Sequence, residues 1–484
     1  MKHRITLLLM LFVLLSACAK NPATGSQDFV MMSETEELKI GKQAFHEISK
    51  SIILLPDNDP LAQYVNRVGQ KVAATADRQD LFYRFYVVDD ATINAFALPG
   101  GYIFIHRGLI NHMSNEAELA AVLGHEVGHV TARHSVQQIS KVRAYQTALM
   151  VTSVFVPIPQ GATVFTDMLA LSIIQGYGRD AEFQSDDLSI RYLAQAGYDP
   201  NATIGILKTL KRLDEIDTRE KTDAGEKVEK YHGAFSSHPE TRKRIEKRVA
   251  EASAGQARSG LTNRDALLAA INGYAYGDSA EQGAVVGRRF LHPELGFQLE
   301  FTEEWVINNS PQALQARVRK QEVYFQLQLI ELQKRYSVEE VLQKSFPKKR
   351  NLQITTGKQA GMDYAHARIK QSAPKVSFAM IDAHVFLQGS KAYILTMWCH
   401  RDAFDKHAAD FATVAKSFRP YDKKRDGDIP RITMHQWRGS DSWQALAARS
   451  NNILGRFTAD RLAALNGMDI KERPATGSLI KIVK

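Results

Sequence analysis

The chain has 484 residues, of which 44% are hydrophobic and 24% charged, and these proportions exclude collagen-like, fully disordered and polytopic membrane proteins. Its 62 Lys and Arg residues outnumber 53 Asp and Glu residues, but they are spread along the chain, so we expect a solvated surface and no nucleic-acid partner. Two cysteines, Cys18 and Cys399, are too few for a disulfide scaffold or a cysteine-rich metal site.

The amino end has the pattern of a secretory signal peptide, which we place at residues 1–17. The positively charged Met1–Arg4 precedes an apolar run, Ile5–Leu15, that is too short to span a bilayer. Small residues then lead to Cys18, an arrangement that resembles a bacterial lipobox. This resemblance implies that Cys18 is lipidated and becomes the first mature residue. The Ala19 that follows it implies the outer membrane as the destination.

Residues 18–34 read as a polar tether, and residues 35–251 as a mainly helical domain. Ser33 and Glu36 have the spacing of a capping box, which predicts a helix start. The next elements that we predict are an amphipathic helix over Leu61–Ala74, a strand over Phe82–Val88, and a turn followed by a strand over Asn94–Ile105.

The predicted chemistry lies in one helix, over Glu116–Arg133, which contains His125, Glu126 and His129 as His-Glu-Val-Gly-His. Histidines at i and i+4 share a helical face, so both imidazoles can reach one ion, and the glutamate beside them is placed to deprotonate water there. The two glycines of this helix allow another element to pack closely. We therefore predict a hydrolytic site with one Zn²⁺ per chain; the alternative is a helix that holds these residues by chance.

A hydrolytic zinc site needs a third protein ligand, and residues 176–193 offer two carboxylates. Glu182 and Asp186 are four residues apart, so they share a helical face. We predict Glu182 as the third ligand and Asp186 as the hydrogen-bond partner that fixes the tautomer of a ligand histidine. The alternative is that both are surface charges. His134 reads as an ordinary histidine at a helix end.

Four motifs, in order along the chain, together resemble the zinc metallopeptidases of the CAAX prenyl protease and HtpX type. The motifs are NAFALPGG at 94–101, HEVGH at 125–129, RDAEFQSD at 179–186 and SSHPETRKRI at 236–245. The family's second motif is approximately Glu-x-x-Ala-Asp, and this chain has Ser185 in place of the Ala.

The resemblance covers roughly residues 30–250 and implies a mainly α gluzincin domain with a small edge sheet. It implies zinc held by His125, His129 and Glu182, with Glu126 as the general base. The chain is similar to the periplasmic BepA-like branch, although no tetratricopeptide pattern follows. His238 has two functional interpretations, oxyanion stabilisation or occupation of the open zinc position in a latent enzyme, beside a structural one at the turn before Pro239.

Residues 144–175 are markedly apolar and contain Pro157 and Pro159, which interrupt any helix. Since Met150–Val156 is too short to cross a membrane, we expect a buried helical pair that covers the cleft, in preference to a membrane hairpin.

The carboxyl half is typical of binding domains. We predict a linker over 252–289, an α/β accessory domain over 290–421 that weakly resembles the Mog/PsbP-like fold, and a polar linker over 422–430. Residues 431–484 are predicted as a small βααβ module that resembles LysM. The resemblance implies peptidoglycan binding through residues 433–483; the alternative is a docking module without sugar affinity.

Together these features predict a lipid-anchored zinc metalloendopeptidase at the periplasmic face of the outer membrane. Its expected substrates are misfolded or unassembled envelope proteins. One alternative is a non-enzymatic assembly chaperone or peptidoglycan-associated scaffold with a latent metal site. Another is a peptidoglycan hydrolase, which the LysM-like end suggests.

Overall fold

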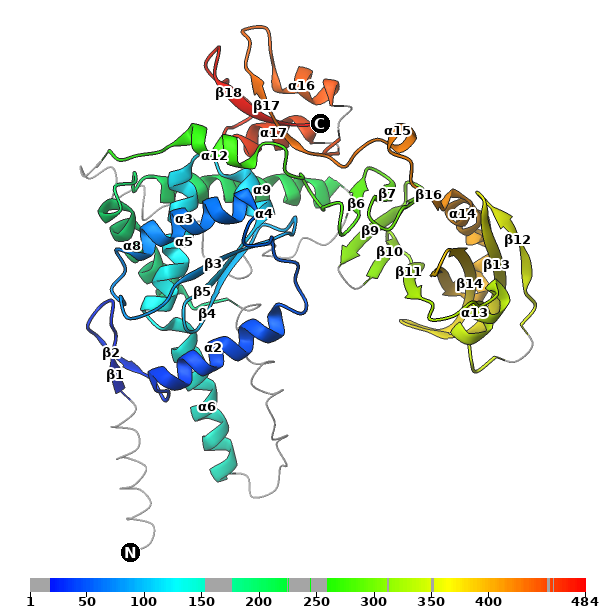
Figure 1. Ribbon diagram of the computed structural model, residues 1–484, viewed down its shortest axis with the longest axis horizontal. Helices are drawn as coiled ribbons and strands as arrows, with labels where there is room; N and C mark the ends of the chain where they lie inside the picture. Colours follow the sequence, from blue (N-terminus) through cyan, green and yellow to red (C-terminus); the bar gives the residue numbers. More distant parts are fainter. Residues whose placement is uncertain are drawn as a thin grey trace, which may run out of the picture. The chain divides into compact units, whose positions relative to one another are not determined.

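The computed structural model describes residues 18–152, 176–223, 225, 244, 259–310, 313–349, 352–450, 453–455 and 457–484. The chain forms two compact units: unit 1 comprises Met1–Tyr276 and Arg431–Lys484, and unit 2 comprises Gly277–Pro430 (Figure 1). The predicted signal peptide and His238 lie outside the described residues.

Unit 1 is mainly helical in its amino-terminal part. Its elements are β1 (Cys18–Lys20), β2 (Gln27–Phe29), α2 (Glu34–Ile48), α3 (Pro60–Ala73), β3 (Arg84–Val88), β4 (Ala95–Leu98), β5 (Tyr102–His106), α4 (Arg107–His112), α5 (Glu116–Thr131), α6 (His134–Thr152), α8 (Arg179–Gln195), α9 (Ala202–Asp223), α12 (Arg264–Ile271), β17 (Ile432–Gln436), α16 (Trp443–Arg449), α17 (Thr458–Leu465) and β18 (Leu479–Val483). The predicted helix start is present, because the Ser33 side chain accepts a hydrogen bond from the Glu36 backbone.

A three-stranded sheet, in the order β3-β5-β4, separates two helical layers of unit 1 (Figure 1). Ala97 and Ile103 face the main core with α3 and α5, whereas Phe96 and Phe104 face a second core with α2 and α6. The turn and the strand predicted within Asn94–Ile105 are present at residues 99–101 and in β5, and a further strand, β4, precedes the turn; its residues are all buried and pair antiparallel with β5. Strands β4 and β5 therefore form a hairpin, joined by a short turn at residues 99–101.

The carboxyl-terminal residues belong to unit 1. They have the predicted βααβ order, with β17 and β18 antiparallel. Trp443 and Ile480 lie in the same core as helices α3 and α5, and the fully buried Lys481 donates hydrogen bonds to the carbonyl oxygens of Asn111 (2.8 Å) and Met113 (2.6 Å). This segment therefore completes the core of the helical region.

We predicted a linker over residues 252–289, but its described part contains a helix and a strand. Helix α12 buries Leu267 and Ile271 in the main core of unit 1, and strand β6 begins a sheet of unit 2 at Ala284. An eight-residue helix is too short to give a clear periodic pattern, which is why the sequence favoured a linker.

Unit 2 is rich in β-structure. Its elements are β6 (Ala284–Val286), β7 (Arg289–His292), β8 (Phe297–Glu300), β9 (Trp305–Ser310), β10 (Ala313–Val318), β11 (Tyr324–Glu331), α13 (Val338–Ser345), β12 (Thr355–Gln359), β13 (Met362–Ala373), β14 (Val376–Gln388), β15 (Lys391–His400), η1 (Arg401–Ala403), α14 (Phe404–Ser417), β16 (Arg419–Pro420) and α15 (Lys423–Asp426). A seven-stranded antiparallel sheet, β12-β13-β14-β15-β11-β10-β9, has α13 in one core and α14 in another. Helix α13 begins with a complete capping box, formed by Ser337 and Glu340.

Among the helices of the described residues, none is long and apolar enough to cross a membrane. The apolar stretch 144–175 is helical as far as Thr152, at the end of α6, and residues 153–175 lie outside the described part of the chain. The predicted cover over the cleft therefore stays a prediction.

Candidate metal centre

Two helices bring the predicted metal ligands together because glycines let them approach closely. Helix α5 carries His125, Glu126 and His129 and is buried on nearly every side. A Cβ atom on Gly124 would lie 3.1 Å from the Leu193 side chain, and one on Gly128 would lie 3.2 Å from the Ser185 backbone. Both neighbours belong to α8, the helix of Glu182. The glycines thus bring the carboxylate of one helix within reach of the imidazoles of the other.

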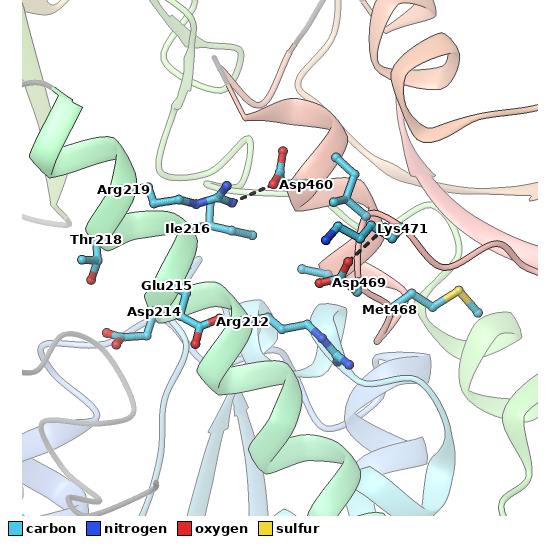
Figure 2. A pocket seen from close by; sticks show the side chains of 12 residues that line it. Arg212, Asp214, Glu215, Ile216, Thr218, Arg219, Asp460, Met468, Asp469 and Lys471 are labelled. Atoms are coloured by element: carbon cyan, nitrogen blue, oxygen red, sulfur yellow. Dashed lines mark hydrogen bonds and ion pairs between the residues drawn. The ribbon is translucent and has the colours of Figure 1, made fainter.

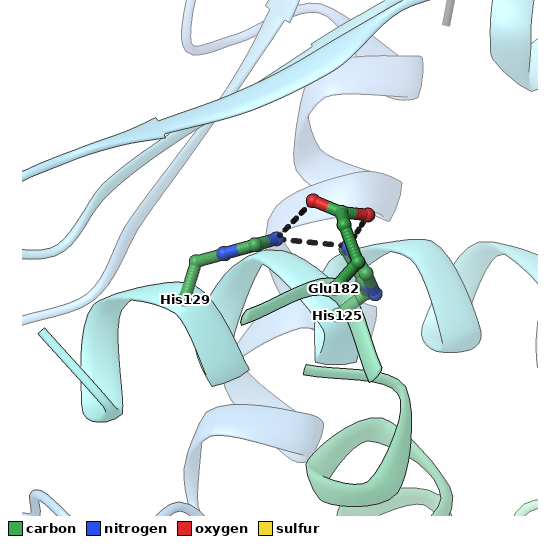
Figure 3. Close-up of side chains that lie close together, drawn as sticks. All are labelled: His125, His129 and Glu182. Atoms are coloured by element: carbon green, nitrogen blue, oxygen red, sulfur yellow. Dashed lines mark hydrogen bonds and ion pairs between the residues drawn. The ribbon is translucent and has the colours of Figure 1, made fainter. Parts of the chain in front are cut away.

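The side chains of His125, His129 and Glu182 converge on one point (Figure 3). The Nε2 atoms of the two histidines are 2.9 Å apart. The Glu182 carboxylate lies 3.5 Å from His125 Nε2 and 3.4 Å from His129 Nε2. All three residues are buried. These are the residues that the sequence predicts as metal ligands.

A carboxylate fixes the tautomer of His125. Its Nδ1 lies 2.9 Å from Asp186 Oδ1, and since a carboxylate only accepts, this nitrogen carries the proton. The Nε2 atom therefore presents its lone pair to the convergence point. The structure thus places Asp186 in the hydrogen-bonding position that the sequence predicts for it.

A relay of two side chains fixes the tautomer of His129. His134 Nε2 donates to Gln184 Oε1 at 2.6 Å, so its Nδ1 carries a lone pair and accepts a hydrogen bond from His129 Nδ1 at 2.9 Å. His129 then also presents an unprotonated Nε2. Burial lowers the pKa of His134 to about 4, which keeps it neutral in this relay. The sequence treats His134 as an ordinary helix-end histidine; the structure makes it the partner of His129.

The donor set fits a zinc ion. Two nitrogen lone pairs and a carboxylate at these separations repel one another unless a positive charge lies among them. With the protein groups alone, burial disfavours charge on His125, but hydrogen bonds to Asp186 and Glu182 outweigh burial and raise its pKa to about 9. Burial instead lowers the pKa of His129. A proton and a metal ion therefore compete for His125, and two imidazoles with one carboxylate are donors that zinc prefers.

Glu126 lines a pocket beside these donors. The polar part of its lining consists of Glu126, His125, Asp186, Thr203 and Arg244. The apolar part of the wall is formed by Leu109, Val122, Ile206, Leu207 and Leu210. The structure therefore places the predicted general base at the edge of an apolar pocket, next to the predicted metal ligand.

Arg244 is a site residue that the sequence analysis does not single out. Its guanidinium forms a two-pronged contact with Asp186, through Nε (2.7 Å) and Nη2 (2.6 Å), and its Nη1 lies 2.9 Å from Glu182 Oε2. Burial raises the pKa of Asp186, but the charge of Arg244 outweighs it and holds that pKa below its ordinary value. The only sequence feature that pointed to such a cation was the pair Glu182 and Asp186, because two carboxylates that are buried together need a positive charge nearby.

Two further site residues were predicted from the sequence, His238 and Cys18. His238 lies outside the described residues, so neither of its two predicted roles is tested. Cys18 lies in strand β1, which pairs with β2. Its predicted lipidation remains a prediction.

A larger cavity lies elsewhere in unit 1, where α9 meets the carboxyl-terminal residues (Figure 2). Its lining pairs opposite charges, as between Arg219 and Asp460 at 2.6 Å, and Arg212 donates to the Gly467 carbonyl oxygen at 2.8 Å. The metal donors do not line this cavity, so the smaller pocket beside Glu126 is the stronger candidate for the active site.

Comparisons with known proteins agree with this site. Residues 60–252 match the model of Peptidase family M48. The mitochondrial metalloendopeptidase OMA1 of Schizosaccharomyces pombe is 31% identical over 229 residues, which cover 47% of this chain and 64% of that protein. The beta-barrel assembly-enhancing protease of Escherichia coli K12 is 31% identical over 199 residues, which cover 39% and 40% of the two chains. A putative protein of that kind from Vibrio cholerae is 35% identical over 154 residues, which cover 30% and 32%.

The chain thus spans between about a third and two thirds of the length of these relatives. Among solved structures, cyanobacterial PsbP from Synechocystis matches at a TM-score of 0.23 and 14% identity, over 30% of this chain and 98% of that one. A likeness at this score carries no argument, so the PsbP-like fold of residues 290–421 stays a prediction.

Proposed function

We propose that residues 60–252, which match Peptidase family M48, form a zinc metalloendopeptidase domain, a hydrolase of peptide bonds, and that the whole chain cleaves protein substrates in the bacterial envelope. The observation that carries the proposal is the convergence of His125, His129 and Glu182 beside Glu126 and an apolar pocket. Expected substrates are misfolded or unassembled envelope proteins. The bacterial relatives support this class, since their name describes a protease that enhances β-barrel assembly.

His125, His129 and Glu182 would hold the zinc ion. When bound, zinc supplies Lewis-acid chemistry: it polarises a carbonyl group and makes water more acidic. The protein residues prepare for this by presenting two unprotonated Nε2 atoms. Asp186 and Arg244 keep the His125 ring in place, while His134 does so for the His129 ring.

Glu126 acts as the general base in this proposal. It follows His125 on the same buried helix, so its carboxylate is fixed by the scaffold that fixes the metal ligand. It takes a proton from the attacking water and later delivers a proton to the leaving amine, which balances the hydrolysis. The apolar pocket beside it would accommodate a hydrophobic side chain of the substrate next to the scissile bond.

The amino-terminal pattern supports an anchor. The signal peptide at residues 1–17 and the lipobox-like ending at Cys18 would place the protein at the periplasmic face of the outer membrane. The LysM-like residues 433–483 would bring it to peptidoglycan.

One experiment separates the proposed activity from its rivals. The mature chain from residue 18 is incubated with casein and with purified peptidoglycan, each with and without a zinc chelator. We expect casein cleavage that the chelator abolishes, intact peptidoglycan, and co-sedimentation of the protein with peptidoglycan. Release of peptidoglycan fragments would identify a peptidoglycan hydrolase instead. No cleavage of either polymer by the zinc-loaded protein would favour a chaperone or scaffold.

A further inference from the structure

A second group of metal-type donors lies in unit 2, on neighbouring strands of the seven-stranded sheet. His366 of β13 is directly opposite His384 of β14. Asp382 precedes His384 by two residues, so its side chain is on the same face of the sheet. Strand pairing therefore fixes the three side chains in one place without any loop.

The donor atoms of this group are close together. Asp382 lies between the histidines, with Oδ1 2.8 Å from His366 Nε2 and Oδ2 3.0 Å from His384 Nε2. The two imidazole rings stack with their centroids 4.6 Å apart. One donor atom from each residue lies within 4.8 Å of the others, as in the cluster of unit 1.

The surroundings of this group support a metal ion. Asp382 and His384 are buried, whereas 24% of the His366 side chain is exposed, which leaves an entrance from solvent. The Tyr364 hydroxyl lies 2.9 Å from His384 Nδ1, so in the metal-bound state it would accept a hydrogen bond from that nitrogen and leave Nε2 for the metal.

One neighbouring cation opposes metal binding. Arg368 Nε is 3.5 Å from Asp382 Oδ1, and its guanidinium lies 5.0 Å from the centre of the Phe404 ring. The Arg368 side chain is 55% exposed, so it contributes only a screened charge and can move into solvent. Because Arg368 repels a metal ion, its removal should raise the affinity of the cluster for the ion, which can be measured.

We propose that His366, Asp382 and His384 form a second zinc site, in unit 2. Two imidazoles and one carboxylate are the donor set of a zinc site that keeps an open position. For the ion to bind, the N–H protons that now point at Asp382 would move to the Nδ1 atoms, so that both Nε2 atoms present lone pairs. This site would bind zinc independently of the donors on α5 and α8.

Zinc stoichiometry of the full mature chain tests the proposal. Equilibrium dialysis against Zn²⁺ followed by elemental analysis should give two equivalents for the wild type and one for His366→Gln, whose amide can still donate to Asp382. The matched control is His400→Gln, which changes another histidine of unit 2, 43% exposed and outside the cluster, and should keep two equivalents. Glu182→Gln should keep the equivalent in unit 2, so failure of the first site is distinguished from failure of this one.

Arg368→Gln provides a second measurement, at a side chain that is itself 55% exposed. Removing its positive charge should tighten zinc binding in unit 2 several-fold, measured by titration calorimetry. The proposal is overturned if the wild type binds one equivalent, if His366→Gln retains two, or if His366→Gln and His400→Gln lose zinc equally. Unchanged or weaker zinc binding by Arg368→Gln would also overturn it and leave a hydrogen-bonded structural triad.

Discussion

Arg244 stabilises the metal-free site by neutralising two buried carboxylates, and Arg244→Met isolates that contribution. Methionine keeps an apolar stem of similar length and removes the three contacts to Asp186 and Glu182, which measure 2.6–2.9 Å. Only 5% of the Arg244 side chain is exposed, so water cannot replace them well. Breaking a buried ion pair by removing one partner costs roughly 3–5 kcal/mol. We expect a loss of that size in the free energy of unfolding.

The assay is urea denaturation of the metal-free protein, which avoids any compensation by zinc. The matched control is Arg191→Met, because Arg191 pairs with Asp77 on the surface and its side chain is 42% exposed. Exposed pairs contribute about 0–1 kcal/mol, so this variant should unfold almost like the wild type. Equal unfolding free energies for the two variants would refute the argument that Arg244 neutralises Asp186 and Glu182.

Three further predictions concern other parts of the chain. Burial lowers the pKa of His112 to about 4, below the value of about 6.5 in the unfolded chain, so its contribution to stability is present above pH 6.5 and is lost as the pH falls toward 4. His112→Gln should remove about 2–3 kcal/mol of the acid destabilisation measured by urea unfolding at pH 7 and pH 4.5, and an unchanged pH dependence would contradict this. Cys18→Ala should release the protein from membranes or leave it unprocessed in fractionation, whereas a variant still retained after carbonate washing would point to another anchor. His238→Ala should raise peptide cleavage if His238 blocks the metal and lower it by up to about 10²–10³-fold if it stabilises the oxyanion, and an unchanged rate would leave a structural role.

Local patterns predicted the centre of the site. The spacing of His125 and His129 requires only that one helix form, and helix α5 forms over the predicted residues. The i, i+4 relation of Glu182 and Asp186 similarly needed one helix, α8. Gly124 and Gly128 were expected to allow close packing, and the short distances to α8 confirm it.

Contacts between distant segments could not be predicted in the same way. Arg244 follows Asp186 by 58 residues and is one of several basic residues in its segment. Only the folded chain therefore identifies it as the partner of Asp186 and Glu182. The sequence places Lys481 in a small separate module, yet it is fully buried against the loop after α4. Strand β4 has only four residues, and its pairing with β5 is what makes it a strand.

The central claim is that Glu126 performs the proton transfer in peptide hydrolysis at a zinc site made by its neighbours on α5 and α8. The most direct test is the casein cleavage rate of zinc-loaded Glu126→Gln relative to the wild type, at equal zinc content by elemental analysis. We predict a loss of about 10²–10⁴-fold or more, since a general base contributes that much. Cleavage by Glu126→Gln at the wild-type rate would contradict the account.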